Sequence, residues 1–355
     1  MNQKGSFFVK KKFGLLMLSA VMILSVLAGC SEPETKIVDE KINVYTTFFP
    51  LYDFTRQIGG EHVNVVNLVP AGVEAHDWTP KSRELSDIRK AQVFIYNGAG
   101  FEGWVEDFLG SLEKTDAPHV VKATKGLNLI NVTEVEEKTA TDEHAHENEH
   151  GHDHGHADEH AHEEKATSTE KEAAHDHAHD HGGVDPHTWL SPLQAKEMSK
   201  NIFEALVKVD PQHKADYEKN FATFSAKLDE LHKFYQDSLA ATKRKEIVVQ
   251  HEAYGYLCRD YGLTQKAIMG ISPDAEPTAQ DMKAISDFVK KHDVKYILFE
   301  ELVSDKVAKT LADDLNIGTL VFSPVEGLTE EQDKAGETYI TMMEKNLTNL
   351  VKALQ

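Results

Sequence analysis

Two separate blocks of this 355-residue chain alternate short β-rich runs with helical patterns, and this alternation constrains the fold more than any other feature. Strand–helix alternation is typical of a parallel sheet that carries helices on its faces. In the first block, Thr79-Pro80 is expected to begin one helix as its cap and first residue. The expected strands of this block are 42–48, 63–69 and 93–96, and its expected helices are 51–58, 81–90 and 194–208.

The second block, over residues 243–355, repeats the β–α unit four times, which predicts a second doubly wound parallel sheet. Thr278 and Ser304 are expected to cap two of its helices, because a hydroxyl oxygen can accept a hydrogen bond from the first helical turn. The expected strands are 246–250, 264–269, 294–299 and 319–322, and the expected helices are 254–261, 278–291, 304–315 and 331–354.

One long helical pattern, over residues 210–242, lies between the two blocks. Its large apolar residues recur at steps of three and four, and neither Gly nor Pro interrupts it from Gln212 to Thr242. About thirty residues of α-helix span roughly 45 Å, which is longer than one small domain. The pattern therefore fits a rigid spine between two lobes, with an ordinary long core helix as the alternative.

The N-terminus has the charge order of a secretory signal, because four Lys residues precede a long apolar run. At about 16 residues this run is short for a spanning helix, which needs roughly 20. It ends in Leu27-Ala28-Gly29-Cys30, which resembles a bacterial lipobox. We therefore expect a signal peptide over 1–29, lipidation at Cys30, a polar tether over 30–41 and an extracytoplasmic, lipid-anchored protein, with an uncleaved anchor as the alternative.

The charge of the chain excludes nucleic-acid binding as its function. The chain carries a net charge of −21 at pH 7, and residues 1–29 contain four Lys and no acidic residue, so the remainder carries −25. Phosphate contact needs clustered Lys and Arg, whereas an acidic protein attracts cations. Cys258 is the one Cys beyond Cys30, so the part after the signal cannot form an internal disulfide.

Residues 136–183 differ in composition from the rest of the chain. They contain no Val, Leu, Ile, Met, Phe, Tyr or Trp, so they cannot bury enough apolar surface to fold. His residues are interleaved there with Asp and Glu, which predicts a disordered, metal-binding loop inserted in the first block, with an inert solvated insert as the alternative. The candidate auxiliary ligands are His144, His146, His150, His152, His154, His156, His160, His162, His175, His177, His179 and His181.

Three of the remaining His residues have unusual surroundings. His76 and His251 follow expected strands, and open α/β sheets bind ligands beyond the carboxyl ends of their strands. His187 lies just after the His-rich loop. Three imidazoles that meet in a cleft would suit zinc, which takes nitrogen ligands in tetrahedral geometry. A surface or hydrogen-bonding role is the alternative for each, and we assign that role to His62, His119, His213, His232 and His292.

Five motifs carry a resemblance to a known family. They are Thr46-Thr-Phe-Phe-Pro50, Gly72-Val-Glu-Ala-His-Asp-Trp78, Asp185-Pro-His-Thr-Trp-Leu-Ser-Pro192, Gln250-His-Glu-Ala-Tyr254 and Ile271-Ser-Pro-Asp-Ala-Glu-Pro277. In this order they resemble the zinc-binding lipoproteins of bacterial zinc-uptake ABC transporters. That group also includes manganese-binding and adhesin-type lipoproteins. The resemblance covers essentially all of the chain after the signal.

The resemblance implies a fold and a function. The fold is two doubly wound α/β lobes, 42–209 and 243–355, joined by one long rigid helix over 210–242, with metal in the interlobe cleft. The function is capture of Zn²⁺ by a monomer and its delivery to an ABC permease and ATPase, without enzymatic activity. A manganese-binding homologue, a surface adhesin and a zinc hydrolase are the alternatives.

The resemblance also implies the ligands of the metal. His76, His187 and His251 lie in the matching motifs, and the family places a carboxylate after the last strand of the second lobe, which here is Glu326. Glu300 and Glu301, at another strand end, or a buried water are the alternatives for the fourth ligand. Three imidazoles with one carboxylate favour Zn²⁺, because Mn²⁺ sites favour more oxygen ligands.

Weaker expectations concern the residues around the ligands. A ligating imidazole usually donates its second N–H to a carboxylate or carbonyl, and Asp185 and Glu276 are candidates for that role. Trp78 and Trp189 each follow a ligand His by two positions. Either Trp could shield the site from water or pack as an ordinary core residue.

Overall fold

The structure of the protein is a computed structural model that describes residues 37–113, 117–132, 183–273 and 277–355. The predicted signal peptide, the predicted lipidation site Cys30, most of the predicted tether and the predicted His-rich loop up to residue 182 lie outside these ranges. Within the described ranges, no helix combines the length and the apolar character that crossing a membrane requires.

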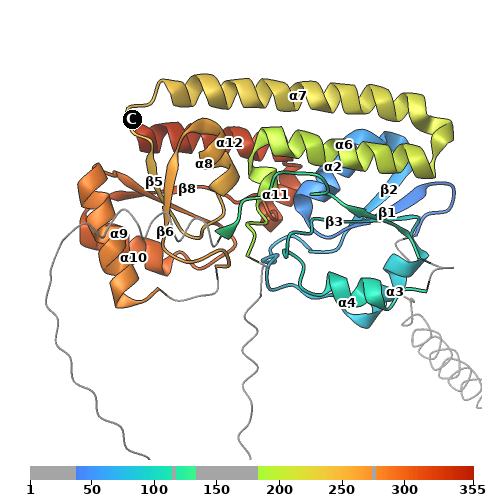
Figure 1. The fold of residues 1–355 in the computed structure, drawn as a ribbon, viewed down its shortest axis with the longest axis horizontal. Coiled ribbons are helices and arrows are strands. Elements are labelled where there is room, and N and C mark those ends of the chain that lie inside the picture. The colour runs from blue at the N-terminus through green and yellow to red at the C-terminus, as the bar shows by residue number, and fades with distance from the viewer. Residues whose placement is uncertain (1–36, 114–116, 133–182, 274–276) are drawn as a thin grey trace, which may run out of the picture.

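Lobe 1 is a four-stranded parallel sheet with helices on both faces (Figure 1). Its elements are β1 (Ile42–Thr46), α2 (Phe49–Gly59), the 3-10 turn η1 (Gly60–His62), β2 (Val63–Asn67), α3 (Ser82–Lys90), β3 (Val93–Tyr96), α4 (Val105–Gly110), β4 (His119–Lys122), the 3-10 turn η2 (Thr188–Leu190) and α6 (Pro192–Val209). The strand order is β2-β1-β3-β4. Alternate strand residues face opposite sides, so Val44 packs with α2 and α6, whereas Tyr45 packs with α3 and α4.

Lobe 2 repeats this architecture with the strand order β6-β5-β7-β8. Its elements are β5 (Glu246–Val249), α8 (Gly255–Tyr261), β6 (Thr264–Ala267), α9 (Ala279–His292), β7 (Tyr296–Phe299), α10 (Lys306–Leu315), β8 (Gly318–Val321), α11 (Glu330–Ala335) and α12 (Tyr339–Leu354). Val248 packs with α9 and α10, and Val249 packs with α8 and α12. The predicted cap Thr278 is confirmed, because its Oγ1 accepts a hydrogen bond from Asp281 N at 3.2 Å.

Helix α7 (Lys214–Ala240), which follows the 3-10 turn η3 (Pro211–His213), links the lobes. It packs on α2 and α6 of lobe 1 and on α8 and α12 of lobe 2, and Figure 1 shows it running along both lobes. Near its end the Tyr235 hydroxyl donates to the Met343 carbonyl of α12 at 2.7 Å. The predicted fold class, two parallel-sheet lobes joined by one long helix, is therefore confirmed.

Several local predictions are wrong, each for a local reason. The caps predicted at Thr79 and Ser304 are replaced by Lys81 and Asp305, which precede the first residues of α3 and α10. The single helix predicted at the C-terminus is divided into α11 and α12, because Gly336 takes a left-handed φ of 70° that ends α11. The sequence patterns also miss β4 and α4, which are four and six residues long.

Candidate metal centre

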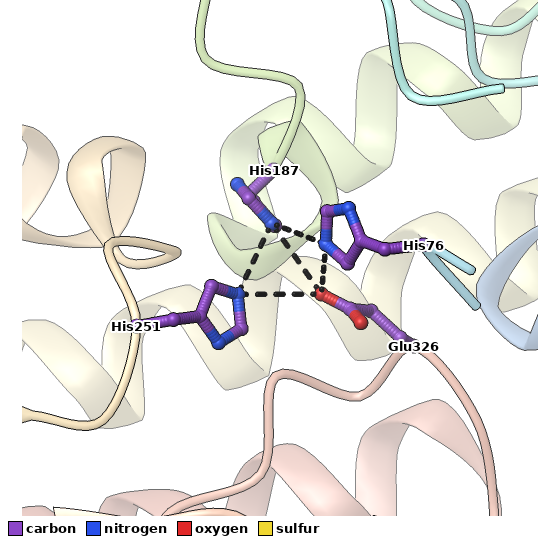
Figure 2. A group of neighbouring side chains, drawn as sticks. All are labelled: His76, His187, His251 and Glu326. Carbon is purple, nitrogen blue, oxygen red and sulfur yellow. Dashed lines mark hydrogen bonds and ion pairs between the residues drawn. The ribbon is translucent and has the colours of Figure 1, made fainter. Parts of the chain in front are cut away.

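Four buried side chains from the two lobes converge at one point (Figure 2). His76 lies in the loop after β2, and His187 caps the 3-10 turn η2, both in lobe 1. His251 follows β5 and Glu326 follows β8, both in lobe 2. Each of the four is 4% exposed or less. The structure thus brings together, between the lobes, the four residues that the sequence singled out as candidate ligands.

The distances between the four side chains fit a single bound ion. Nε2 of His187 lies 3.3 Å from Nε2 of His76 and 3.3 Å from Nε2 of His251. Oε1 of Glu326 lies 3.4 Å from Nε2 of both His76 and His187, and 3.7 Å from Nε2 of His251. In a tetrahedral zinc site with bonds of about 2.0–2.1 Å, neighbouring ligand atoms are about 3.3–3.4 Å apart. The four atoms therefore surround a position at which each could reach the same ion.

Two carboxylates orient two of the imidazoles from behind. Nδ1 of His187 lies 2.9 Å from Oδ1 of Asp185, and Nδ1 of His251 lies 2.5 Å from Oε1 of Glu300. A carboxylate accepts hydrogen bonds, so each Nδ1 carries hydrogen and each Nε2 is left as the ring nitrogen that faces the centre and can bind a cation there. Each carboxylate also accepts a backbone hydrogen bond, because Asp185 Oδ1 accepts from His187 N at 2.9 Å and Glu300 Oε1 accepts from His251 N at 3.3 Å.

A positive charge at the centre would stabilise this arrangement of side chains. Two Nε2 lone pairs that face each other at 3.3 Å repel unless a proton or a cation lies between them. Oε1 of Glu326 is buried and accepts no hydrogen bond from the described part of the chain. Buried polar atoms are nearly always satisfied by a partner, and a bound cation would satisfy both this oxygen and the facing nitrogens.

Burial and the charges of neighbouring groups shift the pKa values of the site residues. Burial lowers the pKa of His76, and the nearby charge of Glu326 offsets this only in part. Burial also acts to lower the pKa of His187, but the carboxylates of Asp185 and Glu326 outweigh it and raise the pKa to about 9. Burial alone would raise the pKa of Glu326, whereas the imidazoles around it hold that pKa well below its usual range. Without metal, His187 therefore holds a proton that faces an ionised Glu326.

Aromatic rings of lobe 1 shield one side of the centre. The ring of Phe101 lies edge-on to His76, with centroids 4.9 Å apart, and the ring of Trp189 lies 5.2 Å from that of His187. Trp189 is fully buried in the hydrophobic core and also packs on His187, so its position fits both roles that the sequence left open. Trp78 is half-buried and packs against Trp104, with centroids 6.1 Å apart, as a core residue would.

The structure separates the alternatives for the fourth position. Glu300 lies behind His251, and Glu301 is exposed and accepts a hydrogen bond from Gln332 at 2.8 Å, so Glu326 is the carboxylate that faces the imidazoles. Glu276, a candidate orienting acid, lies outside the described residues. Sequence reasoning therefore missed the orienting role of Glu300. The signal for it was available, because Glu300 directly follows β7, the strand beside β5.

Sequence reasoning also missed Glu74, which lies two residues before His76. Burial and the charge of Glu326 raise the pKa of Glu74 to about 8, so its carboxyl group holds a proton near neutral pH. The other His residues that the structure describes have the surface or hydrogen-bonding surroundings expected from the sequence. The pairs are His62 with Asp216, His213 with Asp210, His232 with Tyr261 and His292 with Glu246, and His119 lies in β4.

Replacing Glu300 by Gln should weaken zinc binding by roughly 10- to 100-fold, the range found for residues that orient a metal ligand. The Gln side chain has nearly the size of Glu300 but no charge, so Nδ1 of His251 loses its charged hydrogen-bond acceptor. Glu301→Gln is the matched control, because this neighbour is exposed and bonds to Gln332. Competition of each variant with a chelator measures the effect, and equal affinities for the two variants would contradict an orienting role for Glu300.

Comparison with known proteins relates this chain to zinc-binding proteins. The model of a family described as zinc-uptake complex component A, periplasmic, matches residues 44–353. The high-affinity zinc uptake system protein ZnuA of Bacillus subtilis is 38% identical over 349 residues, which cover 97% of this chain and 98% of that protein. The zinc-binding lipoprotein AdcA of Streptococcus pneumoniae is 38% identical over 340 residues, or 96% of this chain. The chain spans 60% of the length of AdcA.

Solved structures have the same fold. The Zn(II)-bound ZnuA-like domain of Streptococcus pneumoniae AdcA superposes with a TM-score of 0.68 at 35% identity, covering 88% of this chain and 99% of that domain. The laminin-binding protein Lmb of Streptococcus agalactiae, described as a bifunctional protein with adhesin and metal-transporting activity, gives a TM-score of 0.69 at 27% identity. That match covers 88% of this chain and all of Lmb, so the two-lobe fold extends over nearly the whole of both chains.

Proposed function

The chain belongs to the zinc-uptake complex component A family, and on that premise we propose that it captures Zn²⁺ outside the cytoplasm and delivers it to an ABC permease for uptake. One observation carries the proposal: three imidazoles and one carboxylate, supplied by both lobes, surround a single buried point. The proposed ligands are His76, His187, His251 and Glu326. The nucleotide-hydrolysing partner of that permease would supply the energy for transport.

Zinc is the preferred cargo because of the donor set and its spacing. Imidazole nitrogen suits zinc, whereas manganese sites are richer in oxygen ligands. Four donors about 3.3–3.7 Å apart also match tetrahedral geometry, which zinc adopts when four protein ligands close its site. Manganese is the alternative cargo, and it would require further oxygen ligands beyond Glu326.

The same four donors support transport rather than catalysis. Catalytic zinc sites keep one coordination position open for water or substrate, whereas structural and storage sites are closed by protein ligands. Every proposed ligand here is 4% exposed or less, so an ion can enter or leave only when the surrounding loops or lobes move apart. A site that closes over its ion and must open to release it suits a carrier.

We also propose the predicted place of the protein in the cell. The lipobox-like sequence that ends at Cys30 supports a lipid anchor on the outer face of the membrane. The relative AdcA is named a zinc-binding lipoprotein, which agrees with this anchor. A monomer fits the ligand set, because one chain provides all four donors.

We propose that the His-rich segment over 136–183 collects zinc for the centre. Because the segment lacks large apolar residues, binding an ion there costs conformational entropy that few packing contacts offset. The preformed centre avoids most of this loss of conformational entropy. Ions in the His-rich segment should therefore bind weakly, although tethering next to His187 gives them an effective concentration of about millimolar.

Deleting residues 142–181 should lower the zinc bound per chain and leave one tight site unchanged. Equilibrium dialysis with metal analysis gives the stoichiometry, and chelator competition gives the affinity of the remaining site. Loss of the tight site on deletion would mean that the segment supplies a primary ligand, and the assignment of the four-residue centre would be wrong.

Growth under zinc limitation tests the proposed function. We express this chain and its cognate ABC permease in a bacterium that lacks its own zinc-binding lipoprotein. That bacterium should grow in medium that contains a zinc chelator, and His251→Ala should abolish the growth. His232→Ala is the control, because His232 bonds to Tyr261 and does not belong to the ligand group. Growth with His251→Ala equal to that of the unchanged protein would refute the proposal.

A further inference from the structure

The turn that carries Glu326 belongs to lobe 2 in sequence, but lobe 1 holds it in place. Three hydrogen bonds cross from lobe 1 to the carbonyl groups of every second residue along this turn. Trp189 Nε1 donates to Pro324 O at 2.7 Å, Phe49 N donates to Glu326 O at 3.3 Å, and Gly72 N donates to Leu328 O at 2.7 Å. The orientation of the fourth candidate ligand therefore depends on lobe 1.

The turn contains a strained residue directly before Glu326. Val325 has a φ of 56°, in the left-handed region that β-branched residues rarely adopt. Such a residue keeps this conformation only when its surroundings over-determine it. Val325 is fully buried, and its N–H donates to Ser323 Oγ at 3.0 Å. The Trp189 and Phe49 hydrogen bonds fix the carbonyl groups on either side of it.

Trp189 joins the two halves of the centre. Its ring packs on His187, with centroids 5.2 Å apart, and on Phe48, with centroids 4.6 Å apart, so its position is fixed inside lobe 1. Its indole N–H reaches across to the residue before Val325. One side chain thus contacts a candidate ligand of lobe 1 and holds the turn of the candidate ligand from lobe 2.

We propose that Trp189 is a positioning residue of the metal centre: its hydrogen bond to Pro324 maintains the left-handed turn at Val325 and so keeps the Glu326 carboxylate among the three imidazoles. The inference rests on the proposed function, since it takes Glu326 as a ligand. Without this hydrogen bond, Val325 relaxes toward extended backbone and Glu326 turns away. Separation of the lobes breaks the same bond, so withdrawal of Glu326 is coupled to opening and speeds release of the ion.

Trp189→Phe tests the proposal, because it removes the indole donor and keeps a buried ring. In protein that lacks residues 142–181, titration with Zn²⁺ against a chelator should show affinity lowered by about 10-fold or more and faster release. Tyr339→Phe is the matched control. It removes a buried hydrogen bond from the same neighbourhood, since the Tyr339 hydroxyl donates to the Trp189 carbonyl at 2.5 Å, without touching the turn. Tyr339→Phe should leave zinc affinity within about twofold of the parent.

A double-mutant cycle separates positioning from general packing. When Glu326→Gln is already present, adding Trp189→Phe should change zinc affinity little, because the carboxylate that Trp189 positions is gone. An equal loss in both backgrounds would overturn the proposal, as would equal affinities for Trp189→Phe and Tyr339→Phe. If Trp189→Phe does not fold, Ser323→Ala provides a second test. It removes the acceptor of Val325 N–H, and unchanged zinc affinity in that variant would also overturn the proposal.

These outcomes differ from failure of the proposed function. A parent protein that binds no zinc tightly would refute both the function and the inference. A parent that binds one zinc ion tightly, with Trp189→Phe unaffected, would refute the inference alone.

Discussion

His251→Ala should lower zinc affinity by more than 100-fold in protein that lacks residues 142–181, and His76→Ala and His187→Ala should do the same. Structural zinc binding is worth about 10–16 kcal/mol, so one of four ligands contributes roughly 3 kcal/mol, which is more than 100-fold in affinity. Each substitution leaves three donors and opens the buried centre. Chelator competition at constant pH measures the affinity of each variant.

The control for these substitutions is His232→Ala, which removes an imidazole that bonds to Tyr261 at 3.0 Å outside the ligand group. Its zinc affinity should equal that of the parent. Undiminished affinity in any of the other three variants would remove that residue from the ligand set. Undiminished affinity in all three would place the tight site elsewhere.

Zinc should also raise the melting temperature of the protein by about 10 °C. A ligand that binds only the folded state stabilises it by about 4 kcal/mol at a free concentration 1,000 times its Kd. For domains of this size each kcal/mol moves the melting temperature by about 2–4 °C. Calorimetry of the protein lacking residues 142–181, with and without Zn²⁺, measures the shift, and a chelator should reverse it. No shift would contradict an interlobe metal site.

The zinc-induced rise in melting temperature should depend on pH, and the protonation of His187 determines whether it grows or shrinks as pH rises. Its folded pKa is raised to about 9 from an ordinary 6.5, so the proton stabilises the zinc-free fold below pH 6.5, and this contribution is lost as pH rises through about 9. Zinc must displace the same proton, so its affinity rises over the same range. The zinc-induced increase in melting temperature should therefore be larger near pH 8.5 than near pH 6.5. An increase that shrank with rising pH would contradict the exchange of a proton for the ion.

Features that repeat along the chain could be predicted from sequence. Parallel strands buried on both faces give short apolar runs such as Val93–Tyr96, whose bounds agree with β3, and the uninterrupted helical pattern predicts α7. His251 could be found because it follows a predicted strand directly, where α/β sheets bind ligands. Strand β4 gave no such signal, because Pro118 precedes it and its four residues include only two apolar ones, Val120 and Val121.

Features that depend on contacts between residues far apart in the sequence could not be derived from local sequence patterns. Glu326 entered the candidate set through resemblance, because a carboxylate after β8 has no local property that distinguishes it from Glu300 after β7. Packing decides between them: Glu300 contacts Nδ1 of His251 from behind, whereas Glu326 faces Nε2 of three imidazoles. The left-handed turn at Val325 is equally hidden, since the carbonyl groups on either side of it accept hydrogen bonds from Trp189 and Phe49 of the other lobe.

X-ray absorption at the zinc edge, on protein lacking residues 142–181 and loaded with one Zn²⁺ per chain, tests the central claim most directly. The structure predicts four nitrogen or oxygen neighbours at about 2.0–2.1 Å, with the outer-shell scattering of three imidazoles and no sulfur. His251→Ala should reduce that imidazole signal by one ring, and His232→Ala should leave it unchanged. Five or six oxygen neighbours, or fewer than three imidazoles in the unchanged protein, would contradict a centre built from His76, His187, His251 and Glu326.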